Sequence, residues 1–162
     1  TAEKTGPKSL AAFLFQVRGL VGAASNEYYK PANSDLASVI DKKRGLPVTL
    51  ACVYQLIGAR VGIEVCGCNF PGHFLAKVEE EDQTLLVDCF HGGRFFREKD
   101  LLKTHKGPPE ALRQLIEKPA DSETILRRVL RTLVGSYEKS EEIENRRVIS
   151  DLLAAMEARR KP

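Results

Sequence analysis

Apolar residues recur at the three- and four-residue spacing of a helix near the start of the chain. Between residues 10 and 21 they form one stripe (Leu10, Phe13, Leu14, Val17, Leu20 and Val21), and Ser9 stands where a helix cap is expected. After a polar loop, a short second helix is predicted to begin at Asn33 or Ser34 and to end near Gly45.

The segment from Pro47 to Val61 has a different pattern. Proline suits the first position of a helix, and apolar residues then fall on all sides of the helix that the segment predicts. We therefore expect this helix to be central and covered by other elements.

Alternating apolar and polar positions predict strands over residues 63–69, 73–79 and 84–90. The acidic run at residues 79–82 separates the last two strands and is typical of a solvated hairpin tip. A short fourth strand is predicted in "RFFRE", followed by a helix over residues 110–118.

Two further amphipathic helices are predicted near the end of the chain. We expect residues 1–118 to form a core domain and residues 119–162 to form a helical hairpin tail. Apolar residues mark one side of each tail helix: Ile125, Val129, Leu133 and Tyr137 in the first, and Ile143, Leu152, Leu153 and Met156 in the second.

Composition narrows the class of protein. The 25 basic residues are interleaved with 22 acidic ones, and a net charge of +3 does not favour nucleic-acid binding. No uncharged run is long enough to span a bilayer, so we expect no membrane partner. Four cysteines without a secretion signal favour free thiols and a cytoplasmic location. The opening "TAEKTGP" is compatible with a fragment of a longer protein, and the oligomeric state is left open.

Candidate chemistry is concentrated between residues 65 and 93, which contain two of the three histidines and three of the four cysteines. If Glu79 pairs with Thr84, the numbers of paired residues sum to 163. His73 and Asp88 then lie on one face of adjacent strands, because side chains alternate with period two. An aspartate at this place can orient an imidazole, which supplies two members of a nucleophile–base–orienter triad.

The best place for the missing nucleophile is the first turn of the third helix. Free backbone N–H groups there lower a thiol pKa and can stabilise an oxyanion. That turn contains Pro47, Val48 and Thr49, and it has no cysteine.

The motifs "RGLPVTL", "NFPGHFL" and "VDCFHGG" together resemble the SirB-type bacterial transglutaminase-like family, whose relatives also occur inside a eukaryotic F-box protein. The resemblance covers residues 10–93, and residues 119–162 are similar to that family's tetratricopeptide-like ending. It implies an α+β fold with a transglutaminase-like (cysteine-protease-like) core, in which His73 and Asp88 match the last two positions of a Cys-His-Asp triad. It also implies that the nucleophilic cysteine is absent and that the family's activity is not established.

Two residues could replace the nucleophile. Cys52 lies in the predicted helix but roughly 7.5 Å beyond Pro47, where the N–H groups are used inside the helix, so a buried and inert thiol is favoured. Thr49 is better placed, but a hydroxyl bonded to local backbone is the favoured interpretation.

A zinc site is the main rival interpretation of the same segment. Cys66, Cys68, His73, Cys89 and His91 are potential ligands. A C-x-C pair is a poor clamp, and the odd register turns Cys89 away from His73. We therefore expect no metal site and no cofactor, with the cysteines in the core and His105 solvated.

Three hypotheses follow for the function. The first is a non-catalytic domain that binds a protein or peptide through the ancestral cleft, with Asn69, Tyr29 and His91 lining it. The second is a hydrolase or acyltransferase that uses His73 and Asp88 with Cys52 or Thr49. The third is a zinc-stabilised interaction module.

Overall fold

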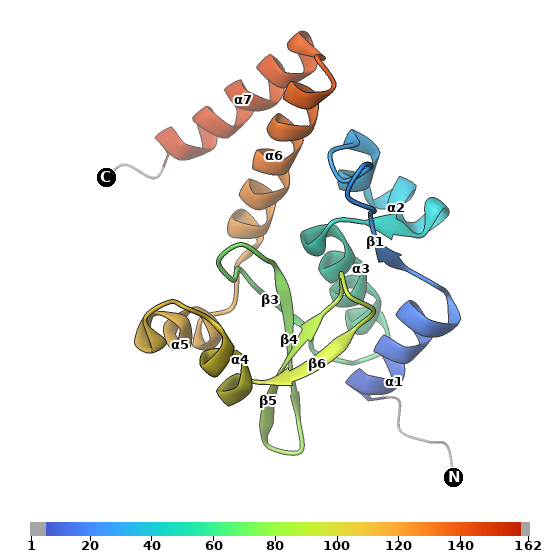
Figure 1. The fold of residues 1–162 in the computed structure, drawn as a ribbon, viewed down its shortest axis with the longest axis vertical. Coiled ribbons are helices and arrows are strands. Elements are labelled where there is room, and N and C mark those ends of the chain that lie inside the picture. Colours follow the sequence, from blue (N-terminus) through green and yellow to red (C-terminus); the bar gives the residue numbers. More distant parts are fainter. Residues whose placement is uncertain (1–5, 160–162) are drawn as a thin grey trace.

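The computed structural model describes residues 6–159. Its chain begins with α1 (Pro7–Ala11), which continues as the π-helical turn η1 (Ala12–Val17) (Figure 1). The helix starts at Pro7, so the predicted cap at Ser9 is wrong. The predicted stripe is also partly wrong, because Phe13 and Val17 are 49% and 73% exposed. A π-helical turn has more residues than an α-helical turn, which rotates these side chains off the buried face.

The second helix begins later than the sequence pattern predicts. A 3-10 turn, η2 (Pro31–Ser34), occupies the predicted start, and α2 (Leu36–Lys42) follows it. The Asp35 side chain caps α2 by accepting a hydrogen bond from the Ser38 N–H. On either side of this segment, β1 (Val21–Gly22) and β2 (Arg44–Gly45) pair in parallel.

The predicted central helix is confirmed as α3 (Pro47–Arg60). Leu46, Leu50 and Tyr54 are completely shielded from solvent around it. The Tyr54 hydroxyl donates a hydrogen bond to the carbonyl of Pro7 (2.8 Å) and so ties α1 to α3.

The four-stranded antiparallel sheet has the order β3-β4-β5-β6. Its strands are β3 (Cys66–Cys68), β4 (Leu75–Glu80), β5 (Gln83–Asp88) and β6 (Arg94–Arg97). The predicted register is confirmed, because Glu79 pairs with Thr84 and Ala76 with Val87. The hairpin tip is confirmed too, with Glu81 and Asp82 in a left-handed turn.

Helices cover both faces of the sheet, and the fold is therefore α+β (Figure 1). One face packs into the same core as α3 through Ala76, Val78, Leu85 and Val87. The other face packs through Leu75 and Leu86 against α5 (Pro109–Glu117) and the adjoining α4 (Glu98–Thr104).

The α4 helix is not predicted from the sequence, and the prediction for His105 is also wrong. The His105 ring is half-buried and lies 4.7 Å from the Phe70 ring, centroid to centroid. The α4 segment, which lies between β6 and the turn at Pro108, is short and has too few apolar positions for periodicity to reveal a helix.

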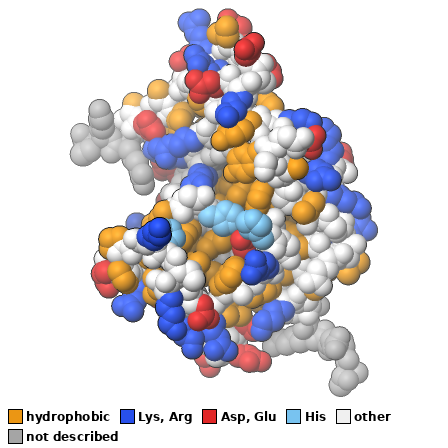
Figure 2. Space-filling view, in the orientation of Figure 1, with side chains coloured by type: hydrophobic (Ala, Val, Ile, Leu, Met, Phe, Trp, Pro, Cys, Tyr) orange, Lys and Arg blue, Asp and Glu red, His pale blue; other side chains and the backbone are white. Residues whose placement is uncertain are grey.

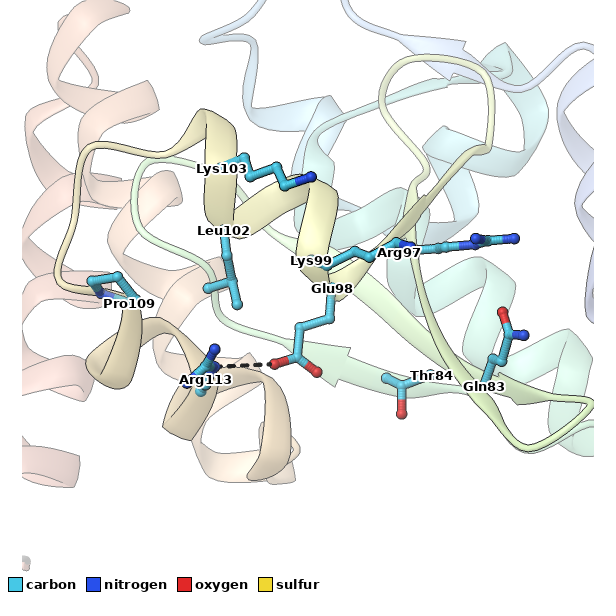
Figure 3. A pocket seen from close by; sticks show the side chains of 9 residues that line it. All are labelled: Gln83, Thr84, Arg97, Glu98, Lys99, Leu102, Lys103, Pro109 and Arg113. Atoms are coloured by element: carbon cyan, nitrogen blue, oxygen red, sulfur yellow. Dashed lines mark ion pairs between the residues drawn. The ribbon is translucent and has the colours of Figure 1, made fainter.

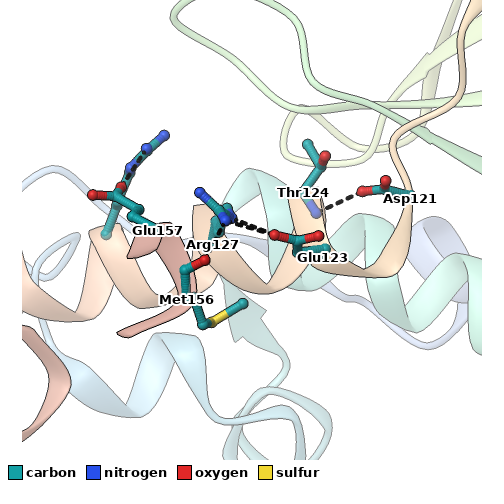
Figure 4. A network of polar contacts seen from close by, with 7 residues as sticks. Asp121, Glu123, Thr124, Arg127, Met156 and Glu157 are labelled. Carbon is teal, nitrogen blue, oxygen red and sulfur yellow. Dashed lines mark hydrogen bonds and ion pairs between the residues drawn. The ribbon is translucent and has the colours of Figure 1, made fainter. Parts of the chain in front are cut away.

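The last two helices, α6 (Ser122–Lys139) and α7 (Ile143–Ala158), form a hairpin at one end of the molecule. The Arg127 guanidinium bonds Glu123 (2.5 Å) and the carbonyl of Met156 (2.8 Å), and so joins the two helices (Figure 4). None of the described side chains of α7 is fully buried. Within residues 6–159, no helix combines the length and the apolar character that crossing a bilayer requires.

Candidate functional site

Three side chains meet at the end of β5. Nε2 of His73 lies 2.8 Å from Oδ1 of Asp88, and Nδ1 of His91 lies 2.7 Å from Oδ2 of the same carboxylate. The predicted neighbourhood of His73 and Asp88 is therefore present, and His91 joins them from the following turn. Figure 2 shows histidine side chains exposed near the middle of one face, beside hydrophobic atoms.

Local backbone geometry brings His91 over Asp88. The Gly93 N–H donates to the Asp88 carbonyl (2.9 Å), and the His91 N–H donates to Asp88 Oδ1 (3.1 Å). Gly92 and Gly93 both have positive φ, which closes the turn tightly. His73 lies in the turn just before β4, where its N–H donates to the Phe70 carbonyl (3.1 Å).

The carboxylate in this cluster is strongly favoured in its ionised form. Burial by itself raises the pKa of Asp88, but the hydrogen bonds from His73 and His91 outweigh it and lower the pKa to about 2. An ionised Asp88 can orient both imidazoles, since each ring faces a different oxygen.

The first turn of α3, where a transglutaminase-type nucleophile would be expected, is closed. Every residue from Leu46 to Leu50 is buried, and Thr49 is only 1% exposed. The Thr49 hydroxyl accepts from the Leu46 N–H (2.9 Å) and donates to the Asn33 carbonyl (2.9 Å). Its hydrogen-bonding capacity is thus used by the backbone, which agrees with the structural interpretation of this residue.

The cysteines are free thiols. Burial raises the pKa of Cys52 to about 11, and Cys52 packs against the main core. Cys68 and Cys89 are buried in the cores on opposite faces of the sheet. A high pKa and burial both disfavour a nucleophilic thiolate. Among the described residues, the one group with metal-ligand spacing contains no cysteine.

An open cleft of about 460 Å³ lies between the core and α6. We call it the α6 cleft, and nine residues line it: Tyr28, Tyr29, Asn69, Thr124, Arg127, Arg128, Arg131, Thr132 and Gly135. Two of the predicted cleft residues, Tyr29 and Asn69, are among them, and Asn69 Oδ1 accepts from Arg128 (3.1 Å).

A chain of aromatic contacts connects the α6 cleft to the histidine cluster. The Tyr28 ring lies 6.0 Å from Phe90, centroid to centroid, and Phe90 lies 6.1 Å from His73 and 5.1 Å from His91. The two sites are therefore neighbours, but His91, which was predicted to line the cleft, is not among the residues that line the α6 cleft.

A second hollow, of about 700 Å³, lies between the β5–β6 side of the sheet and helices α4 and α5 (Figure 3). Its charged lining is mainly basic: Arg97, Lys99, Lys103 and Arg113, with Glu98 opposite Arg113 at 3.9 Å. It includes Gln83, which stands at the other end of β5 from Asp88, roughly 17 Å along the strand. This hollow is therefore separate from the histidine cluster.

Sequence reasoning missed two parts of the site. One is the direct contact of His91 with Asp88, although an aspartate four residues before a Gly-Gly pair is a turn signal. The other is the arginine row on α6, where Arg127, Arg128 and Arg131 share the cleft wall at helical spacing.

Comparisons with known proteins are consistent with this architecture. A family model described as the transglutaminase-like superfamily matches residues 2–131. A "UPF0162 protein" of Xylella fastidiosa is 38% identical over 132 residues, which are 77% of this chain and 46% of the relative. A UPF0162 protein of Pseudomonas aeruginosa is 33% identical over 106 residues, or 64% of this chain and 38% of the relative.

A shorter similarity reaches a eukaryotic protein. "F-box only protein 21" of Homo sapiens is 27% identical over 64 residues, which are 40% of this chain and 10% of that protein. The chain spans less than half the length of the bacterial relatives that it matches. No solved structure matches it.

Proposed function

Because this chain belongs to the transglutaminase-like superfamily, we propose that it uses the superfamily's cleft to bind an acidic protein or peptide segment and carries out no acyl transfer. Two observations carry the proposal: the first turn of α3 is closed, and the α6 cleft is open. The Thr49 hydroxyl is buried and bonds backbone groups, so it is not available to react with a peptide in that cleft.

The position of the former nucleophile acquires a structural role in this proposal. The Asn33 carbonyl accepts from Thr49, while the Asn33 amide donates to the carbonyls of Glu27 (2.7 Å) and Tyr28 (3.1 Å). The first turn of α3 therefore anchors the loop that carries the two cleft tyrosines. A rigid aromatic wall reduces the entropy lost when a peptide binds.

The charges of the α6 cleft support an acidic partner. Arg127 and Arg131 bond Glu123 and Glu157 within the tail, whereas Arg128 bonds the neutral amide of Asn69. A guanidinium with a neutral partner can add a carboxylate without losing an ion pair, and the fork geometry suits two carboxylate oxygens. The adjacent tyrosines offer flat faces for apolar side chains.

The bacterial and eukaryotic similarities allow a more detailed version of the proposal. We assign the chain to the SirB-type branch of the superfamily, with a core of residues 1–118 and a tetratricopeptide-like tail of residues 119–162. We also propose a cytoplasmic location, in keeping with four free thiols.

The binding proposal can be tested with peptide selection. Random peptides displayed on phage and selected on the 162-residue chain should be rich in Asp and Glu. Arg128→Gln should weaken a selected synthetic peptide about tenfold, measured by calorimetry, because one charge-assisted contact is lost. The matched control is Arg146→Gln on α7, outside the cleft, which should leave the affinity unchanged. Peptides without acidic residues, or equal losses in the two variants, would contradict the proposal.

The absence of acyl transfer has its own test. At pH 8 a thiol with a pKa of about 11 is roughly one-thousandth ionised, so a thiol-reactive mimic of a glutamine amide should leave Cys52 unlabelled. His73→Ala should not change that result. Labelling of Cys52 that disappears in His73→Ala would instead support the hydrolase or acyltransferase.

A further inference from the structure

The histidine cluster has the composition of a metal site. The ligand atoms of His73, Asp88 and His91 all lie within 4.8 Å of one another, and this is the one such cluster found in residues 6–159. We propose that these three residues bind a divalent transition-metal ion of the zinc class, in a site that goes beyond the peptide-binding function and does not depend on it.

The donor types select the class of ion. Two imidazole nitrogens and one carboxylate oxygen are the ligand set of open zinc sites, which leave a fourth position for water. Calcium and magnesium prefer six or more oxygen ligands, so they fit this cluster poorly. First-row ions that accept nitrogen, such as Zn²⁺ and Co²⁺, fit it well.

The present geometry is close to a coordinating one. Ligand atoms around a tetrahedral zinc ion stand roughly 3.3 Å apart, given bonds of about 2.0–2.1 Å. Both histidine nitrogens already point at the Asp88 carboxylate, at 2.8 and 2.7 Å. A metal ion would replace the protons in these contacts, and each nitrogen–oxygen distance would lengthen by about half an ångström to admit it.

The movement falls on the most exposed of the three side chains. The His91 side chain is 58% exposed, whereas the side chains of His73 and Asp88 are only 24% and 11% exposed. Solvent can therefore deliver the ion from the His91 side. The His91 N–H bond to Asp88 Oδ1 (3.1 Å) orients the carboxylate as a supporting contact.

The site proposed here differs from one built on the cysteines. Cys89 follows Asp88 in the chain but points into the core on the opposite face of the sheet, and its side chain is completely buried. The ligands are thus two nitrogens and an oxygen, with no thiolate.

Cobalt titration of the metal-free 162-residue protein tests the proposal. We expect one equivalent of Co²⁺ to bind, with visible ligand-field bands, no thiolate-to-cobalt charge-transfer band, and displacement by Zn²⁺. His91→Ala should weaken binding by at least roughly tenfold, because a ligand is lost. The matched control is His105→Ala, which removes the third histidine and should leave the affinity unchanged.

Each other outcome overturns the proposal. Equal affinities of the His91→Ala and His105→Ala proteins would show adventitious binding, and a charge-transfer band would assign the ion to cysteines. No cobalt spectrum at a millimolar ion concentration would show that the cluster is a hydrogen-bonded array only. Circular dichroism of both variants checks that each remains folded.

Discussion

Two turns of this molecule, which we propose stand at the two halves of a transglutaminase-type catalytic centre, have opposite characters. The first turn of α3 is buried from Leu46 to Leu50, and the Thr49 hydroxyl bonds only backbone groups. The turn after β5 exposes the His91 side chain and holds it against the buried Asp88, which His73 also contacts.

Under this proposal, the two halves of the centre differ because their groups have different requirements. Groups that orient a base need only each other, so the His–Asp contact persists wherever the strand register persists. A nucleophile needs exposure and a free helix terminus, and α3 offers neither. The first turn of α3 contributes to packing, while the β5 turn remains available for ligands.

The largest expected effect tests how rigidly the β5 turn is held. A Cβ added at Gly93 would lie 2.4 Å from Cδ2 of the buried Phe15, whereas one added at Gly92 meets nothing within 4 Å. Both positions have positive φ, so both variants incur backbone strain. Gly93→Ala should lower the free energy of unfolding by about 3 kcal/mol or more, and Gly92→Ala by about 1 kcal/mol.

Urea denaturation of the two alanine variants gives the comparison directly. Because backbone strain is common to both, the difference between them isolates the contact with Phe15. Equal losses of stability would mean that the turn can move away from the core, and the fixed placement of His91 would then be lost.

The next effect tests the buried character of the first turn of α3. Thr49→Val keeps the shape of the side chain but leaves the Leu46 N–H and the Asn33 carbonyl without their hydroxyl partner. Buried polar groups that lose a partner should lower the free energy of unfolding by about 2–3 kcal/mol in total. Thermal or urea denaturation measures this loss.

Thr104→Val provides the matched control, because that hydroxyl is exposed and bonds the carbonyls of its own helix. Its effect should stay within about 0.5 kcal/mol. A Thr49→Val protein as stable as the control would show that the hydroxyl is free, which would favour Thr49 as a nucleophile.

Much of this arrangement follows from sequence patterns that depend on local physics. The acidic run at residues 79–82 marks a hairpin tip, and the tip fixes a register that brings His73 beside Asp88. Apolar residues on all sides of α3 likewise indicate burial before any contact is known. Periodicity is informative where one face of an element must be covered.

Other features depend on contacts between distant segments, which one sequence does not encode locally. The hydrogen bond from Thr49 to Asn33 joins residues 16 positions apart, and Arg128 reaches Asn69 across 59 positions. The π-helical turn that exposes Val17 is a further example, because the α-helical spacing of the apolar residues does not predict it.

The smallest effect, and the one with a pH signature, concerns Asp88. Burial raises its pKa, but the bonds from His73 and His91 lower it to about 2, from an ordinary 3.8. A carboxyl with a lowered folded-state pKa stabilises the fold above its unfolded pKa, near 4, and this contribution is lost as the pH falls through about 2. Asp88→Asn should therefore lower the free energy of unfolding by about 2 kcal/mol at pH 7, and the difference from wild type should shrink between pH 4 and pH 2.

Asp151→Asn, at an exposed position of α7, is the control and should have little effect at either pH. A loss that stays constant from pH 7 to pH 2 would mean that Asp88 supports the β5 turn by packing and not by charge, and the two turns would then differ less than their side chains suggest.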